Sequence, residues 1–310
     1  MITVNHLSRN YGKFVAVRDV SFEIPRGAVV GLLGHNGAGK TTIMKVLTGY
    51  LEPTEGSAFI DGLDITSQRL DIQRKIGYLP ENSPVYPEMS VIDYLEYVAE
   101  LRDIPLEDRV PALRNAIQRT GLEEKVADNV NTLSRGFKQR VGVAQAILHE
   151  PEILILDEPT NGLDPSQIEE MRQLIRDLSE KTTIILSTHI LQEVNAVCDR
   201  VLIISQGSVV LDSPLENLSG RNQFLLETDS PLHFIKEALK NISIISEIQQ
   251  VSTLNGHGPT RNEYRITLQD EEPTVSAEII RTLIEKGSNL FAFQTESKNL
   301  ESIFKEVSSD

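Results

Sequence analysis

The sequence predicts an α/β domain built on a largely parallel sheet, followed by a small α+β domain. Up to about residue 215, short apolar runs that suit strands buried on both faces alternate with helical patterns. A glycine-rich segment joins the first of these runs, 29–33, to a helical pattern. After Ser213 and Pro214 the order of elements starts again. We therefore expect two domains, residues 1–215 and 216–310.

Length and composition agree with this division. A chain of 310 residues suits two domains, and its shares of 40% hydrophobic and 24% charged residues are ordinary for a soluble globular protein. The net charge of −15 disfavours sequence-independent binding to nucleic-acid phosphates, so we expect no nucleic-acid partner. The single cysteine, Cys198, excludes an intramolecular disulfide and fits a reducing cytosol. Its apolar neighbours favour a small buried side chain over a nucleophile.

The sequence does not suggest insertion into a membrane. Residues 1–4 are not a charged region followed by an apolar core, so we expect no signal peptide. Apolar runs are far shorter than the ~20 residues that a membrane span requires. If the chain works in transport, other polypeptides must supply the pore.

The elements of the first domain follow from its apolar runs. We expect strands at 29–33, 153–156 and 182–187, and a helix at 41–47 after the glycine-rich segment. Between about residues 90 and 150, apolar residues recur at spacings of three and four, which predicts a helical insert within the α/β domain.

The second domain follows a different order. We expect strands at 224–227, 242–251, 264–268 and 290–295, helices at 232–239, 275–286 and 300–307, and a loop at 255–259 between the two middle strands. This order, βαββαβ plus a helix, is that of a ferredoxin-like unit.

The segment Gly34-x-x-x-x-Gly39-Lys40-Thr41 matches the P-loop pattern of nucleotide-binding proteins. Its glycines allow turns that aim backbone N–H groups at phosphate oxygens, and the helix that follows adds its positive N-terminal end. Lys40 can reach the β- and γ-phosphates, and the Thr41 hydroxyl can bind Mg²⁺. The alternative is an ordinary glycine-rich turn. The residues expected to bind ATP here are Gly34, His35, Asn36, Gly37, Ala38, Gly39, Lys40, Thr41 and Thr42.

An acidic pair, Asp157 and Glu158, ends the apolar strand 153–156. A strand that delivers a carboxylate to the C-terminal edge of the sheet is how P-loop enzymes hold Mg²⁺. We expect Asp157 to do so through a water molecule, and Glu158 to polarise the attacking water. The alternative is a solvated pair at a strand end, and the P-loop 117 residues earlier favours the metal site.

The run 133–140, Leu-Ser-Arg-Gly-Phe-Lys-Gln-Arg, lies between these motifs, and its Ser134 lies 23 residues before Asp157. It resembles the signature motif of ATP-binding-cassette (ABC) ATPases, in which Leu-Ser-Gly-Gly-Gln is usual. Arg135 and Phe137 depart from that pattern, as in type-2 ABC exporters. Ser134 and Gly136 remain, at the start of a predicted helix that suits an anion. The alternative is a simple helix cap.

Further segments match the same family in order. The run 161–164 resembles the D-loop, and His189 resembles the switch histidine that binds the γ-phosphate and positions Glu158. Tyr11 lies where the family has an aromatic residue that stacks on adenine; the alternative is a core or surface tyrosine. Glu81 replaces the usual glutamine of the Q-loop, and its carboxylate can accept a hydrogen bond from metal-bound water.

The resemblance covers about residues 1–215 and implies an ABC-type P-loop ATPase with ATP and Mg²⁺ as cofactors. Catalysis would use Glu158, His189 and Lys40, with Mg²⁺ held by Thr41, Glu81 and Asp157. It also implies a head-to-tail homodimer, in which Ser134 and Gly136 of one chain complete the ATP site of the other.

The resemblance implies an integral-membrane permease as partner, met by the segment 82–89, and a place on the cytoplasmic face of the cell membrane. The variant signature and the C-terminal domain, whose tail at 299–304 is also similar, favour an exporter. Two alternatives stay open: an ABC ATPase that acts on nucleic acid or ribosomes, and a nucleotide switch without transport. The sequence does not indicate the cargo or the role of the C-terminal domain.

Overall fold

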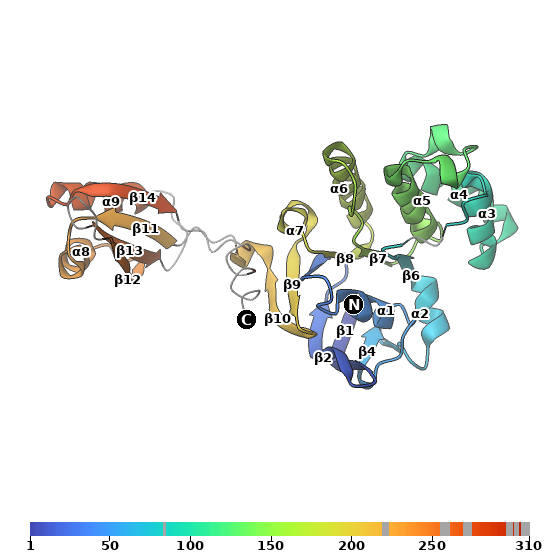
Figure 1. The fold of residues 1–310 in the computed structure, drawn as a ribbon, viewed down its shortest axis with the longest axis horizontal. Coiled ribbons are helices and arrows are strands. Elements are labelled where there is room, and N and C mark those ends of the chain that lie inside the picture. The colour runs from blue at the N-terminus through green and yellow to red at the C-terminus, as the bar shows by residue number, and fades with distance from the viewer. Residues whose placement is uncertain are drawn as a thin grey trace. The chain divides into compact units, whose positions relative to one another are not determined.

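A computed structural model describes residues 1–82, 85–218, 223–254, 261–268 and 275–295, together with residues 300 and 304. The chain divides into two compact units, Met1–Leu215 and Glu216–Asp310. Figure 1 shows the elements of each unit. The sequence predicted domains at 1–215 and 216–310.

In the described part of the first unit, six strands form a sheet in the order β10-β9-β3-β8-β7-β6. The first five in chain order are parallel, and β10 pairs antiparallel with β9. All residues of β3, β7 and β8 are buried, as expected for strands covered on both faces. The three predicted strands are confirmed to within one residue. The strands are β3 (Val29–Leu33), β6 (Ile76–Leu79), β7 (Ile153–Asp157), β8 (Thr183–Thr188), β9 (Arg200–Ser205) and β10 (Ser208–Pro214).

The two faces of this sheet are covered by different elements, because side chains alternate along a strand. Ile153 and Ile155 pack with α1 (Lys40–Leu47) and with a second sheet, whereas Leu154 and Leu156 pack with helices on the other face. The second sheet has the order β2-β1-β4-β5 and is antiparallel. Its strands are β1 (Ile2–Tyr11), β2 (Phe14–Ile24), β4 (Glu55–Ile60) and β5 (Leu63–Asp64), and the remaining helices around the large sheet are α2 (Arg69–Lys75), α6 (Pro165–Ser179) and α7 (Leu191–Val197).

The predicted helical insert is present. Helices α3 (Val91–Leu101), α4 (Leu106–Thr120) and α5 (Arg135–Ile147) contact one another and form a group to one side of the large sheet (Figure 1). Ser90 caps α3 by accepting a hydrogen bond from the Asp93 backbone N–H at 3.2 Å. Short 3₁₀ turns at Glu123–Lys125 and Val130–Thr132 connect α4 to α5.

In the described part of the second unit, four antiparallel strands have the order β12-β13-β11-β14. This is the strand order of a ferredoxin-like βαββαβ unit, and its core is separate from the cores of the first unit. The elements are β11 (Gln223–Thr228), α8 (Leu232–Leu239), β12 (Ile245–Leu254), β13 (Arg261–Leu268), α9 (Val275–Glu285) and β14 (Leu290–Thr295).

The predicted strand at 242–251 is wrong at both ends, since β12 covers Ile245–Leu254. The chain after α8 first makes turn hydrogen bonds, from Ile242 N to the Leu239 oxygen at 3.0 Å and from Ile245 N to the Ile242 oxygen at 3.2 Å. The predicted loop at 255–259 lies outside the described residues, and so does the predicted helix at 300–307 apart from Leu300 and Phe304.

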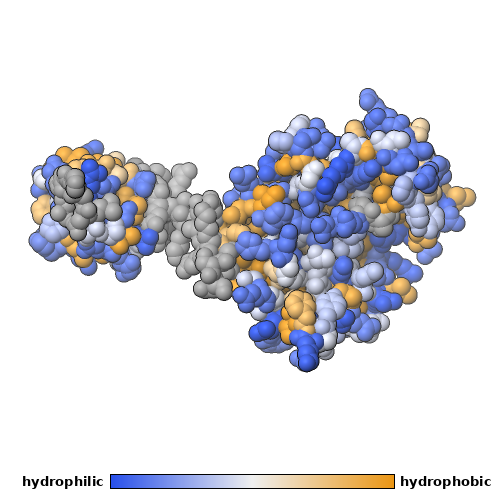
Figure 2. All heavy atoms as spheres, in the orientation of Figure 1, coloured by the Kyte–Doolittle hydropathy of each residue, from blue (hydrophilic) through white to orange (hydrophobic). Residues whose placement is uncertain are grey.

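Polar residues cover most of the face of the first unit that Figure 2 presents. None of the helices in the described ranges combines the length and the apolar character needed to cross a membrane. Cys198 packs close to Gly31, where an added Cβ would lie 3.1 Å from its sulfur. Cys198 is half-buried and not fully buried as expected, although burial of its thiol raises the pKa of that group.

Candidate active site

The glycine-rich loop connects β3 to α1 at the carboxyl edge of the large sheet. It closes with a hydrogen bond from Ala38 N to the His35 oxygen at 3.1 Å. Gly39 stands at the N-terminal end of α1 with φ 110°, and it caps the helix without a side-chain hydrogen bond. The amides of the first turn are therefore not used by a capping side chain, which suits them to an anion.

Lys40 is the first residue of α1, and its side chain folds back over the loop. The residue is only 5% exposed. Its Nζ donates to the Gly34 oxygen at 2.7 Å and to the His35 oxygen at 3.3 Å. The same nitrogen lies 3.4 Å from Glu158 Oε1. This contact is an ion pair without the geometry of a hydrogen bond, since Glu158 Oε1 has no hydrogen-bond partner in the described structure.

Asp157 ends β7 and is fully buried. Its Oδ1 accepts hydrogen bonds from the Thr41 hydroxyl at 3.3 Å and from the Ser187 hydroxyl at 2.5 Å. Its Oδ2 is buried and has no partner among the described atoms. Buried carboxylate oxygens are normally satisfied, so this one suits a water molecule held by a cation.

The residues around Asp157 therefore fit Mg²⁺. Within the described ranges, no group of three or more His, Cys, Asp and Glu side chains could hold a metal by itself. Mg²⁺ does not need one, because it is usually bound by one or two carboxylates together with waters and the phosphates of a nucleotide. The hydroxyl oxygen of Thr41 and Asp157 Oδ2, which has no partner among the described atoms, are oxygen ligands suited to such a site.

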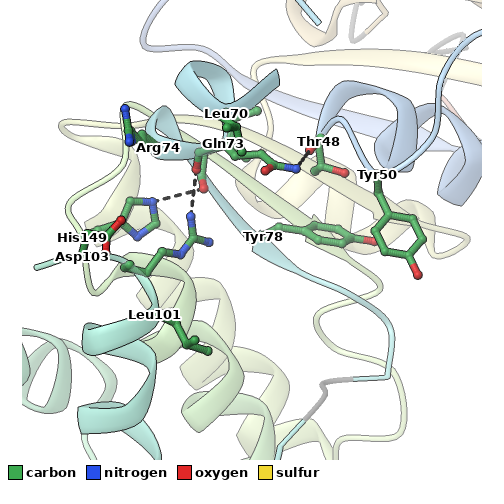
Figure 3. A pocket seen from close by; sticks show the side chains of 11 residues that line it. Thr48, Tyr50, Leu70, Gln73, Arg74, Tyr78, Leu101, Asp103 and His149 are labelled. Atoms are coloured by element: carbon green, nitrogen blue, oxygen red, sulfur yellow. Dashed lines mark hydrogen bonds between the residues drawn. The ribbon is translucent and has the colours of Figure 1, made fainter. Parts of the chain in front are cut away.

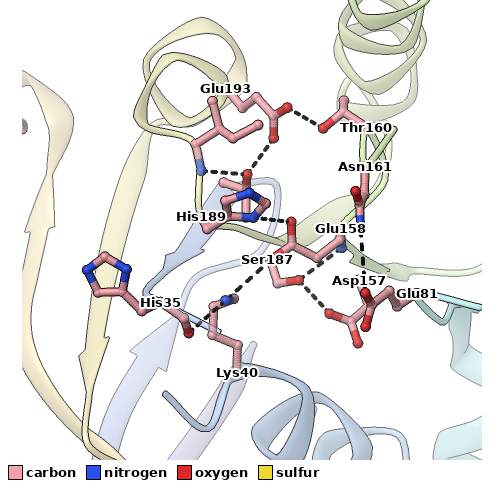
Figure 4. A network of polar contacts seen from close by, with 12 residues as sticks. His35, Lys40, Glu81, Asp157, Glu158, Thr160, Asn161, Ser187, His189 and Glu193 are labelled. Atoms are coloured by element: carbon pink, nitrogen blue, oxygen red, sulfur yellow. Dashed lines mark hydrogen bonds and ion pairs between the residues drawn. The ribbon is translucent and has the colours of Figure 1, made fainter. Parts of the chain in front are cut away.

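Glu158 has a left-handed backbone, with φ 49°, which is uncommon for a residue other than glycine. Two backbone hydrogen bonds hold Glu158 in this conformation. Its N–H donates to the Ser187 hydroxyl at 3.0 Å, and its carbonyl oxygen accepts from Asn161 N at 3.1 Å. The side chain is buried, and its Oε2 lies 2.9 Å from His189 Nδ1 (Figure 4). Strained residues that several contacts hold in place cluster at functional sites.

These groups line one cavity of about 590 Å³. It contains most of the residues predicted from the sequence, and Gly34, His35, Ala38, Asp157, Ser134 and Gly136 are not among its lining residues. The lining residues are Tyr11, Phe14, Ala16, Asn36, Gly37, Gly39, Lys40, Thr41, Thr42, Glu81, Glu158, Asn161 and His189.

Glu81 follows β6 by two residues and lines this cavity. Its Oε1 accepts a hydrogen bond from Asn161 Nδ2 at 3.5 Å. The segment after β6 and the loop after Glu158 therefore meet at the cavity through side chains.

Two aromatic residues flank the mouth of the cavity from one hairpin. Tyr11 ends β1 and is 45% exposed, and Phe14 begins β2 and is 63% exposed. The Arg9 guanidinium carbon lies 5.0 Å from the centroid of the Tyr11 ring. Phe14 was not predicted as a site residue. It is the partner of Tyr11 across the β1–β2 hairpin, so its closeness to Tyr11 in the sequence could have indicated it.

The signature residues lie elsewhere in the chain's own structure. Ser134 caps α5 by accepting a hydrogen bond from Phe137 N at 3.4 Å. Gly136 is buried, and an added Cβ would lie 2.7 Å from the Gln167 side chain. Neither residue lines the cavity that holds Lys40. One copy of the chain therefore does not bring the signature to its own P-loop.

Sequence reasoning missed the residues that support the site. The Ser187 hydroxyl joins Asp157 to the Glu158 backbone, and Glu193 binds the hydroxyls of Thr160 and Thr188. Their positions in the sequence carry no motif, apart from the closeness of Ser187 and Thr188 to His189.

Comparison with known proteins gives a consistent picture. A family model described as "ABC transporter" matches residues 17–161. The chain is 32% identical over 313 residues to an uncharacterized ABC transporter ATP-binding protein, YdbJ, of Bacillus subtilis, covering 98% of this chain and 94% of that protein. It is 37% identical over 229 residues to the bacitracin transport ATP-binding protein BcrA of Bacillus licheniformis, covering 73% of this chain and 74% of that protein.

Solved structures show the same architecture. The dimeric structure of a bacterial ABC transporter cassette has a TM-score of 0.64 to this chain at 26% identity. The match covers 69% of this chain and 99% of that cassette.

Proposed function

Because this chain belongs to the ABC transporter family and is an ATP-hydrolysing subunit of a transporter, we propose that it powers export through a separate permease. One observation carries the assignment of chemistry to residues. Lys40, Glu158 and His189 line a single cavity beside the P-loop. Lys40 Nζ lies 3.4 Å from Glu158 Oε1, and His189 Nδ1 lies 2.9 Å from Glu158 Oε2.

The proposed reaction is in-line attack of water on the γ-phosphate of ATP. Glu158 orients that water and accepts its proton, because its carboxylate lies in the cavity at the end of β7. His189 holds Glu158 through its Nδ1 contact at 2.9 Å. The P-loop amides and Lys40 stabilise the charge that develops on the phosphate oxygens. ADP is the leaving group.

Mg²⁺, when bound, would neutralise charge on the β- and γ-phosphates. In the proposal Thr41 holds it directly, Asp157 holds it through a water, and Glu81 is the third residue that binds it. The buried, unpartnered Asp157 Oδ2 supports this assignment.

The working state in the proposal is a homodimer with two ATP molecules between the subunits. The signature residues Ser134 and Gly136 lie away from their own cavity, at the N-terminus of α5. In a head-to-tail pair they would meet the phosphates bound by the partner, where a helix N-terminus stabilises anions. Tyr11 would stack on the adenine at the mouth of the cavity.

The permease is proposed to dock in a groove of about 520 Å³ between α2, β6 and the helical insert. Three large apolar side chains that line it, Tyr50, Leu70 and Leu101, are each more than 60% exposed (Figure 3). Clustered exposed apolar groups of this kind mark interaction sites. The predicted contact segment 82–89 lies near α3, where the Tyr86 ring is 5.5 Å from that of Tyr97, although residues 83 and 84 lie outside the described part.

Docking to a permease would place the chain on the inner face of the cell membrane. Export is favoured because relatives of this chain are named as bacitracin and lantibiotic transport proteins. The family membership and the charge of −15 disfavour the alternative of a nucleic-acid ATPase.

The deciding experiment replaces the proposed base. We expect Glu158→Gln to lower the turnover number by at least about a hundredfold, because the amide cannot accept the proton. ATP binding should persist, and the variant should form an ATP-dependent dimer that sediments as such. Phosphate release and analytical ultracentrifugation measure the two effects.

Glu180→Gln, which changes an exposed acid after α6, serves as the matched control and should turn over at the wild-type rate. Wild-type turnover in Glu158→Gln would reject the role of Glu158. A variant that binds ATP but stays monomeric would reject the shared site.

A further inference from the structure

The structure contains a buried carboxylate that the proposed chemistry does not use. Glu193 lies in the first turn of α7 and is 2% exposed. Its Oε1 accepts a hydrogen bond from the Thr160 hydroxyl, and its Oε2 accepts one from the Thr188 hydroxyl at 2.5 Å (Figure 4). No salt bridge to Glu193 is found in the described ranges, so both of its oxygens are committed to the two threonines.

The two threonines lie beside the proposed catalytic pair, one in the loop after β7 and one at the end of β8. Thr160 follows Glu158 by two residues and is 4% exposed. Thr188 is the last residue of β8, directly before His189, and is fully buried. Its hydroxyl also accepts a hydrogen bond from Ile190 N at 3.0 Å, which fixes the turn that presents His189.

A buried carboxylate is costly unless hydrogen bonds satisfy it, and once satisfied it holds its donors firmly. Here a single side chain joins the loop after β7 to the last residue of β8. The same two segments also contact each other through the Ser187 hydroxyl, which accepts a hydrogen bond from Glu158 N at 3.0 Å, and through the 2.9 Å approach of His189 Nδ1 to Glu158 Oε2. The contact of His189 with Glu158 is at the surface of the cavity, whereas the Glu193 contacts lie behind it.

We propose that Glu193 is a positioning residue that keeps His189 in register with Glu158 by fastening Thr160 to Thr188. It does not touch ATP. The inference rests on the proposed roles of Glu158 and His189. It predicts that weakening the bridge slows turnover while leaving the P-loop, and hence ATP binding, in place.

The first test is Glu193→Gln, which keeps the size of the side chain and replaces one acceptor oxygen by an NH₂ group. We expect kcat for ATP hydrolysis to fall by about tenfold to a hundredfold, as for other small displacements of catalytic groups, with KM within about twofold of wild type. Glu180→Gln is again the control and should retain both constants.

A double-variant cycle separates this role from a merely structural one. If Glu193 acts through His189, adding Glu193→Gln to His189→Ala should lower kcat by less than about twofold further. Multiplication of the two separate losses would overturn the proposal. A rise in KM that equals the fall in kcat would overturn it as well, because the binding site itself would then have been damaged.

A second pair of variants protects the test against poor folding of the Glu193 variant. Thr160→Ser keeps the hydroxyl and should keep the wild-type kcat, whereas Thr160→Val keeps the shape and should show the loss expected for Glu193→Gln. Equal rates in the two Thr160 variants would overturn the proposal. Wild-type turnover in His189→Ala would instead reject the role given to His189, and the Thr160 pair would still decide whether the bridge supports Glu158.

Discussion

At the scale of single residues, the site depends on backbone conformations that few residues adopt. Gly39 has φ 110°, and a Cβ there would lie 2.7 Å from the Ala16 backbone oxygen. Gly37 also has a positive φ, 84°, but a Cβ there would have no heavy atom within 4 Å. Glycine is therefore required at position 39 by both its conformation and the lack of space for a Cβ, and at position 37 by its conformation alone.

This difference predicts the outcome of two matched substitutions. Gly37→Ala should reduce the free energy of unfolding by about 1 to 2 kcal/mol, the cost of a left-handed residue with a Cβ. Gly39→Ala should lose about 1 to 3 kcal/mol more, because the added methyl group meets fixed backbone. It should also raise KM for ATP by at least about tenfold, since α1 begins at the next residue. Urea denaturation and steady-state kinetics measure these effects, and equal losses in the two variants would contradict the explanation.

At the scale of elements, hydrogen bonds join the helical insert, which contains α3, α4 and α5, to β6, the strand that leads to Glu81. Three of its side chains donate hydrogen bonds to backbone oxygens of α2 and β6, and Figure 3 shows two of them. The contacts are from Arg102 to the Gln73 oxygen at 2.8 Å, from His149 Nε2 to the Ile76 oxygen at 3.1 Å, and from Gln145 to the Tyr78 oxygen at 2.8 Å. A shift of α5 would therefore be transmitted to β6 through these bonds.

One of these contacts depends on pH. Burial, with a further contribution from the charge of Arg102, lowers the pKa of His149 to about 4 from its ordinary 6.5. The unfolded chain therefore binds more protons than the folded chain between these values. The stability that neutral His149 contributes is complete above pH 6.5 and is lost as the pH falls toward 4, by at most about 1.4 kcal/mol per pH unit.

The difference in unfolding free energy between the wild type and His149→Gln should follow this curve. We expect it to shrink as the pH falls from 7 to 4, because the glutamine does not titrate. Chemical denaturation at several pH values measures it. A difference that stays constant between pH 7 and pH 4 would contradict a buried neutral imidazole.

At the scale of the whole molecule, the chain consists of two units with separate hydrophobic cores. The cavity beside the P-loop is lined entirely by residues of Met1–Leu215. Units with separate cores can unfold in separate steps, and a ligand stabilises only the unit that binds it.

Calorimetry of the full chain should therefore resolve two transitions, of which ATP shifts one. ATP at about 100 times its Kd should add about 2.7 kcal/mol to the unit that carries the P-loop. Leu226→Ala, in the core of the second unit, should reduce the free energy of unfolding of that unit by about 2 to 5 kcal/mol and so lower the temperature of its transition. ATP binding should be unchanged. A single transition that both changes shift would show that the units unfold together.

The sequence by itself determined the P-loop, the acidic pair at the end of β7 and the order of elements in both units. These features are local: the spacing of Gly34, Gly39 and Lys40 encodes a strand, a turn and a helix within a few residues. The same local reasoning misplaced β12, because the turn after α8 depends on hydrogen bonds that a hydrophobic pattern does not reveal.

The tertiary structure alone decided how the proposed catalytic residues meet and what supports them. Asp157 and Glu158 are about thirty positions from Ser187 and His189, and they meet because β7 and β8 are parallel neighbours with Asp157 opposite Ser187. The register of that strand pair also brings Thr160 and Thr188 within reach of Glu193. Such contacts depend on which strands pair and in what register, and no spacing along a single chain specifies them.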